Sequence, residues 1–158
     1  MISNFLIHNN TITKLNLSKT IITNNGTKYL SEVIKYNTTL SSLNLSECFI
    51  DCSKDINLNV LYEALQTKYS LTKLNSSNNK LGSKEYMQLS NVLKVNTTLT
   101  NLNLKNICLY VKLDVFKLFY EVLKTNYSLT KLNLSISDYI YHASMIILDK
   151  YDKDDEYI

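Results

Sequence analysis

A short pattern of apolar and polar positions recurs five times along the chain. Each copy reads L-x-x-L-x-L or a close variant, so its second and third apolar residues lie two apart, as do side chains on one face of a β-strand. The copies begin 28 to 31 residues apart, at Ile12, Leu40, Leu71, Leu99 and Leu129. The pattern therefore predicts five short strands at a regular period.

Apolar residues with helical spacing follow the first four copies. Residues four positions apart lie on one face of a helix, and each copy supplies such a pair. The pairs are Leu30 and Ile34, Leu61 and Leu65, Leu89 and Leu93, and Phe119 and Leu123. A closing helix is expected within residues 140–150. The pattern predicts a repeating strand–helix unit.

One strand–helix unit cannot bury its own apolar face, whereas stacked units share a core. The predicted fold class is α/β, a leucine-rich-repeat solenoid. We expect a right-handed horseshoe arc with a parallel sheet on the concave face and helices on the convex face. We predict a single domain over residues 1–158, with a partial repeat at 1–11, repeats starting near 12, 40, 71, 99 and 129, and an acidic and lysine-rich tail at 149–158.

Two segments carry a resemblance to a family. The chain reads Tyr36-Asn-Thr-Thr-Leu-Ser-Ser-Leu-Asn-Leu-Ser46 in one repeat and Val95-Asn-Thr-Thr-Leu-Thr-Asn-Leu-Asn-Leu104 in another. Both resemble the ribonuclease-inhibitor-like repeats of leucine-rich-repeat proteins, especially those of NOD-like receptors. The resemblance covers about residues 3–148. It implies an α/β horseshoe with a binding role, and it names no ligand.

The ninth position of the repeat departs from that family. The family prefers Asn or Cys there, because the side chain caps backbone groups where the strand ends. The residues in this chain are Thr20, Cys48, Asn79, Ile107 and Ser137, of which only Cys48 and Asn79 conform. We expect Cys48 to be a buried turn residue. Ser76 also takes an inward leucine position, so we expect modest stability.

Composition narrows the function classes. The formal net charge of +3 is too small to favour nucleic acid, for which a concentrated basic face is expected. The start of the chain lacks the charged and apolar regions of a signal peptide, and no apolar run is long enough to cross a bilayer. With 3 cysteines and no C-x-x-C pair, a disulfide framework is not expected. We therefore expect a cytoplasmic protein that binds neither nucleic acid nor membrane.

Catalytic and metal-binding constellations find no support in the sequence. Cys48, Cys52 and Cys108 lack a fourth ligand and the spacing of a zinc site. His8 and His142 stand far apart in the stack and have no serine or cysteine partner at a motif spacing. We therefore predict that the chain is not an enzyme and has no cofactor and no metal ion.

The outward strand positions are the candidate binding surface. The fifth position of every strand is Asn, and lysines recur at the third and seventh positions. One interpretation is that the Asn column forms a hydrogen-bonded ladder that stabilises the sheet. The other is a polar, mildly basic groove for an acidic peptide. The candidate partner-binding residues are Lys14, Asn16, Asn44, Lys73, Asn75, Asn103, Lys105, Lys131 and Asn133.

Several functional hypotheses remain open at this point. The first is a non-catalytic protein–protein interaction module that binds a partner through the curved surface. The alternatives are a regulator of an enzyme (a GTPase activator or an enzyme inhibitor) and a truncated repeat array without independent function. Apolar ends could also allow end-to-end self-association. Tyr36, Tyr69 and Tyr127 recur at the helix ends, where we expect them to pack over the helix–strand corner.

Overall fold

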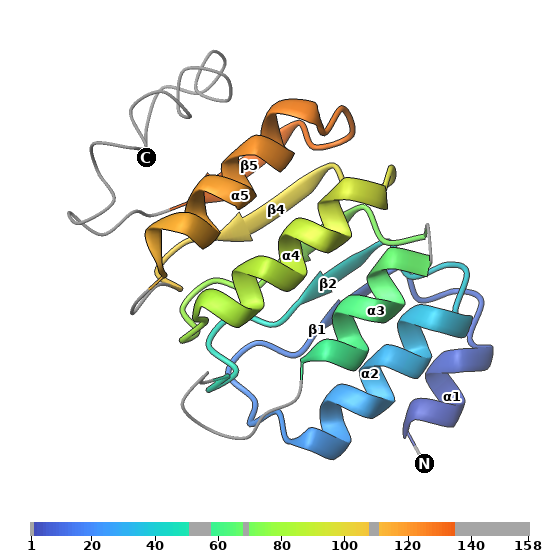
Figure 1. The fold of residues 1–158 in the computed structure, drawn as a ribbon. Helices are drawn as coiled ribbons and strands as arrows, with labels where there is room; N and C mark the ends of the chain where they lie inside the picture. The colour runs from blue at the N-terminus through green and yellow to red at the C-terminus, as the bar shows by residue number, and fades with distance from the viewer. Residues whose placement is uncertain (1, 51–57, 68–69, 108–110, 135–158) are drawn as a thin grey trace.

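The computed structural model describes residues 2–50, 58–67, 70–107 and 111–134 (Figure 1). Within them, short strands alternate with helices in a regular order. The elements are α1 (Ile2–His8), β1 (Lys14–Asn16), α2 (Asn24–Tyr36), β2 (Ser42–Asn44), α3 (Asn59–Thr67), β3 (Lys73–Asn75), α4 (Ser83–Val95), β4 (Asn101–Leu104), α5 (Leu113–Thr125) and β5 (Lys131–Leu134).

The strands form one parallel sheet in the order β1-β2-β3-β4-β5, so each repeat adds its strand beside the previous one. The helices lie side by side over one face of this sheet (Figure 1). Contacts between successive helices, from α1 through α5, run along the stack in the same order. The predicted α/β leucine-rich-repeat fold is confirmed.

The core lies between the sheet and the helix layer. The inward leucines of the middle strands, such as Leu43, Leu74 and Leu102, are almost completely buried, and so are the predicted helix pairs. Tyr86 and Phe119 add an edge-to-face aromatic contact with ring centroids 5.2 Å apart. Apolar residues in or directly after the two outer strands are only half-buried: Leu15, Leu17, Leu132 and Leu134. Ser76 is buried among the leucines, as its inward position predicts.

A buried asparagine fixes the corner where α2, α4 or α5 ends and the next strand begins. In Asn96, the side-chain Oδ1 accepts hydrogen bonds from the backbone N–H groups of Thr98 and Leu99, and Nδ2 donates to the carbonyl of Leu65 in the preceding repeat at 2.7 Å. Equivalent bonds join Asn37 to Leu6 and Asn126 to Leu93. These asparagines therefore turn the chain and also join neighbouring repeats.

The turns where strands end and helices approach use different side chains. Cys48 is 0% exposed, and its Sγ donates to the carbonyl of Leu17 at 3.0 Å, so its predicted role as a buried turn residue is confirmed. Thr20 donates through Oγ1 to the same carbonyl at 2.6 Å. It therefore caps the turn of its repeat in place of the Asn or Cys that the family prefers. Asn79 donates to Leu45 of the preceding repeat.

Some sequence predictions fall outside the described residues. They concern the closing helix, the tail at 149–158, Ser137, Tyr69, Cys52 and Cys108. The division of residues 1–158 into a single domain stays a prediction. Among the residues that are described, no helix has the length and apolar character needed to span a membrane.

Candidate functional site

The candidate site is the sheet face opposite the helices, here called the concave face and defined by the outward residues of β1 to β5. The register of the sheet aligns these residues in rows. One row contains the fifth-position asparagines Asn16, Asn44, Asn75, Asn103 and Asn133. A parallel row contains Lys14, Ser42, Lys73, Asn101 and Lys131, and Lys105 follows β4 directly.

Hydrogen bonds within the Asn row are local to each strand. The Oδ1 of Asn44 accepts the backbone N–H of Ser46 at 3.0 Å, and Asn16, Asn75 and Asn103 make the same bond to the residue two positions on. This is an Asx turn, which bends the chain as the strand ends. Among the described strands, no hydrogen bond joins the amide of one of these asparagines to that of the next, so the ladder interpretation is not supported.

An amide rung does form in another column. Asn106 donates through Nδ2 to Oδ1 of Asn78 at 3.0 Å, across two neighbouring repeats. Both residues occupy the eighth position and have a left-handed backbone, with φ of 56°. Asn tolerates this conformation better than most residues do. The sequence gives no sign of this column, because Lys19 and Glu47 occupy the eighth position in the first two repeats.

The charge of the concave face is one-sided. Lys14, Lys73, Lys105 and Lys131 are exposed, and Asn44, Asn75 and Asn103 are half-buried. Across the described strands β1 to β5, no Asp or Glu occupies any position. Lysines separated by serine and asparagine form a hydrogen-bonding surface with a positive bias. Such a surface suits carboxylates and backbone groups of a protein ligand.

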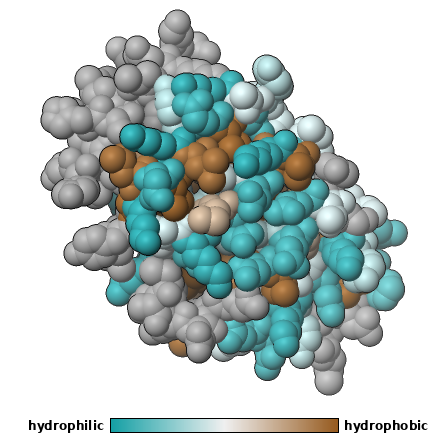
Figure 2. All heavy atoms as spheres, in the orientation of Figure 1, coloured by the Kyte–Doolittle hydropathy of each residue, from teal (hydrophilic) through white to brown (hydrophobic). Residues whose placement is uncertain are grey.

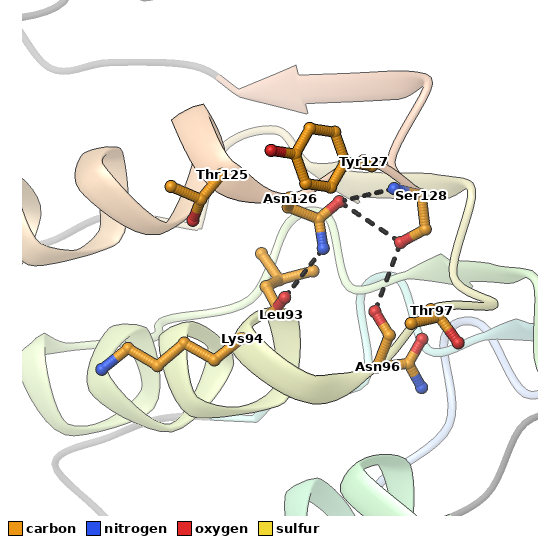
Figure 3. Close-up of a pocket in the computed structure, with 8 residues that line it drawn as sticks. All are labelled: Leu93, Lys94, Asn96, Thr97, Thr125, Asn126, Tyr127 and Ser128. Atoms are coloured by element: carbon orange, nitrogen blue, oxygen red, sulfur yellow. Dashed lines mark hydrogen bonds between the residues drawn. The ribbon is translucent and has the colours of Figure 1, made fainter.

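A pocket of about 260 Å³ lies away from the concave face, at the C-terminal ends of α4 and α5. Figure 3 shows Asn126 directed toward Leu93 and Ser128, with the exposed ring of Tyr127 beside it. Ser128 also donates to the carbonyl of Asn96 at 3.3 Å. The polar groups here bond to one another across the repeat boundary. We therefore attribute the pocket to the corner between two repeats rather than to a ligand site.

The tyrosines at the helix ends do not pack over the corner as predicted. Tyr127 is 95% exposed and Tyr36 is 56% exposed, with the Lys35 ammonium 5.6 Å from the Tyr36 ring centroid. That prediction is wrong because Asn37 and Asn126 themselves occupy the corner. Figure 2 shows a largely hydrophilic helix face, with hydrophobic side chains gathered toward α4 and α5.

Two ionisable groups on the helices have shifted pKa values. Burial, reinforced by the nearby Glu85 carboxylate, raises the pKa of Tyr62 on α3 well above its usual value of 10.0. A hydrogen bond to Glu121 raises the pKa of Lys124 on α5. Both groups lie in the helix layer, away from the concave face. In the described part of the chain, no three His, Cys, Asp or Glu side chains come together in a way that could hold a metal ion.

The sheet, the helix layer and the corner asparagines define a leucine-rich-repeat-type α/β domain. No protein-family model and no curated protein matches the sequence. Solved structures do match the fold. One is described as "Leiomodin-1 Actin-Binding Site 2 (ABS2)", with a TM-score of 0.78, 21% identity, and coverage of 96% of this chain and 87% of that one. Another is the tropomodulin C-terminal domain of Caenorhabditis elegans, with a TM-score of 0.72, 19% identity, and coverage of 96% and 91%.

These matches correct the expected family. The resemblance to ribonuclease-inhibitor-like repeats and to NOD-like receptors is wrong, because leiomodin and tropomodulin domains belong to a different family. The L-x-x-L-x-L motif is dictated by strand packing, so it recurs in every family that stacks this unit. At 19–21% identity, the likeness establishes the fold.

Proposed function

We propose that the chain is a non-catalytic protein-binding module that uses its concave face. The observation that carries this proposal is the alignment of exposed lysines and half-buried asparagines on strands without an acidic residue. Parallel strands held by a packed core give a rigid surface, so little conformational entropy is lost on binding.

The chemistry of the face favours an acidic protein segment. Lys14, Lys73 and Lys105 can pair with carboxylates, while Asn44, Asn75 and Asn103 keep their side-chain amide N–H groups available to bond backbone carbonyls of a ligand. Lys131 and the outer asparagines Asn16 and Asn133 extend the surface to both edges of the sheet. All nine candidate residues therefore contribute to one continuous face.

Charge reversal tests the proposal with a matched control. Lys14, Lys73 and Lys105 are replaced together by Glu in one variant. In the control variant, Lys28, Lys84 and Lys117, which are exposed on α2, α4 and α5, are replaced in the same way. Both variants change the net charge equally. A protein captured by the native chain and the control but lost by the concave variant supports the proposal. Equal capture by all three chains contradicts it.

A second candidate function is binding to actin. It is favoured by the fold, which follows over 96% of the chain a domain described as an actin-binding site. Purified actin labelled with a fluorophore is titrated with the native chain and the two triple variants. Saturable binding that the concave variant loses would name the partner. Absence of saturable binding would remove actin and leave the more general proposal standing.

Regulation of an enzyme is a narrower version of the same proposal. A module that occupies the surface of a GTPase or another enzyme through its concave face would change that enzyme's rate without contributing catalytic groups. End-to-end self-association is a separate proposal, supported by the half-buried Leu15 on the outer strand β1 and Leu17 directly after it. A concentration-dependent sedimentation coefficient would reveal it.

A further inference from the structure

Two large apolar side chains project from the turns at the end of the sheet. Ile21 is 77% exposed and Phe49 is 64% exposed. They occupy the same position in consecutive repeats, one residue before the buried Ile22 and Ile50. The backbone N–H of Ile22 donates to the carbonyl of Cys48 at 3.4 Å, so the two turns lie side by side. Ile21 and Phe49, here called the turn pair, therefore form neighbouring apolar projections.

The backbone holds Phe49 in an unusual conformation. Its φ is 55°, in the left-handed region that a bulky aromatic residue rarely adopts. Other described residues with positive φ are at the eighth position of their repeats, whereas Phe49 is at the tenth. Strain of this kind persists only where the surroundings enforce it, and it concentrates at functional positions.

The surroundings of Phe49 do enforce it. The backbone N–H groups of Cys48 and Ile50 both donate to Oδ1 of Asn79, at 3.0 and 3.2 Å. Cys48 and Ile50 are themselves buried, at 0% and 3% exposure. With the residues on both sides fixed in the core, the Phe49 side chain can only project into solvent. The fold thus presents an aromatic ring from a rigid turn.

The turn pair adjoins the concave face. Ser18 and Ser46, whose backbone N–H groups bond the concave-face residues Asn16 and Asn44, stand three residues before Ile21 and Phe49. Lys19, which is exposed and directly follows Ser18, adds a positive charge at this edge, and Glu47 is the one acidic side chain among the described turn residues 19–21, 47–49, 78–80 and 106–107. The turns that hold the turn pair therefore begin directly at the end of the concave face, and we treat the two as one surface.

We propose that the turn pair is the apolar anchor of that surface, and that its occupant is a protein segment with carboxylates beside an aliphatic or aromatic side chain. The inference rests on the proposed function and deepens it by naming the partner's chemistry. Lysines attract and orient the carboxylates, and the turn pair buries the apolar side chain. Interfaces commonly gain most of their affinity from one such buried cluster.

A short synthetic peptide serves as the probe. A run of aspartates precedes a Leu-Phe pair on a Gly-Ser background, and a matched peptide replaces the Leu-Phe pair by Ala-Ala. The variants are Phe49→Asn, which tolerates a positive φ, and Ile21→Thr, which keeps the branched shape. The control is Tyr29→Gln, which removes an aromatic residue that is 53% exposed on α2. Binding is followed by fluorescence anisotropy, and folding by thermal melting.

The expected result separates binding from stability. Phe49→Asn binds the Leu-Phe peptide at least about tenfold more weakly, as expected for loss of a hot-spot residue. It melts at the same or a higher temperature than the native chain, because the strained aromatic residue is gone. Ile21→Thr weakens binding less, and Tyr29→Gln leaves binding unchanged. The Ala-Ala peptide binds the native chain more weakly than the Leu-Phe peptide does.

Other outcomes overturn the inference. It fails if the native chain does not bind the Leu-Phe peptide, if Phe49→Asn binds as tightly as the native chain, or if the native chain dimerises and Phe49→Asn abolishes the dimer. The variant with Lys14, Lys73 and Lys105 replaced by Glu distinguishes the two proposals. If only that variant loses binding, the concave face binds the peptide and the turn pair does not. If only Phe49→Asn loses binding, the turn pair binds the peptide and the concave lysines do not.

Discussion

Two columns of asparagine run through this molecule, and they do different things. Asn37, Asn96 and Asn126 are buried at the helix-to-strand corners, and each bonds the helix end of the preceding repeat. The concave-face asparagines, such as Asn44 and Asn103, bond only their own chain segment and remain partly accessible. The same residue, recurring at the same period, joins repeats in one place and leaves amide donors for a ligand in the other.

Burial and the span of the hydrogen bonds explain the difference. The carbonyl of Leu65 at one corner is buried. If it loses its hydrogen-bond partner, water cannot replace the bond, and the free energy of unfolding falls. A concave-face amide is in contact with water, which replaces a lost bond at little cost. Recurrence in a sequence therefore marks a repeated environment, and it does not say whether that environment is structural or functional.

The largest effect should come from the corner. Asn96→Ala removes the acceptor for Thr98 and Leu99 and the donor to Leu65, which leaves buried groups without partners. We expect the free energy of unfolding to fall by about 2–4 kcal/mol. Equilibrium denaturation in urea measures it. A loss below about 1 kcal/mol would mean that the corner asparagines do not join the repeats.

A smaller effect is expected on the concave face. Asn103→Ala removes a single hydrogen bond, to the backbone N–H of Lys105, at a half-buried position. We expect a loss of about 0.5–1 kcal/mol in the same urea titration. If Asn103→Ala destabilised the chain as much as Asn96→Ala does, the proposed difference between the corner and concave-face asparagines would be wrong.

The smallest effect belongs to the exposed rung. Asn106→Gly removes the amide bond to Asn78 at an exposed position, and glycine adopts the left-handed backbone, at φ 56°, without strain. We expect a change within about 0.5 kcal/mol, since surface substitutions seldom do more. A larger loss would show that the bond between Asn106 and Asn78 contributes to joining the two repeats.

The strands and the helix faces were predictable from the sequence because their burial imposes a period. Residues such as Leu43 and Leu102 in the strands and Leu89 and Leu93 in α4 follow periods set by backbone geometry alone. The family was not predictable from the same residues, since any stack of this unit requires them. The rows of the concave face also followed, because one shared register aligns equivalent positions.

The turn chemistry could not be read from the sequence. Thr20 and Cys48 both donate to the carbonyl of Leu17, and Asn79 donates to that of Leu45, so three residue types serve the turn and no single type identifies it. The exposure of Phe49 depends on Asn79, thirty residues away, which fixes both of its neighbours. The sequence does contain one indication of the exposed residues. Two repeats have adjacent apolar residues, Ile21-Ile22 and Phe49-Ile50, at a point where the core needs only one.

The most direct test of the concave-face proposal replaces Asn44, Asn75 and Asn103 together by Ala and measures the affinity for a partner captured by the native chain. We expect binding at least about tenfold weaker, measured at a temperature at which the variant is still folded, because its three small losses of stability add up. Unchanged affinity in the folded variant would contradict the account, because these amides would then be no part of the binding surface.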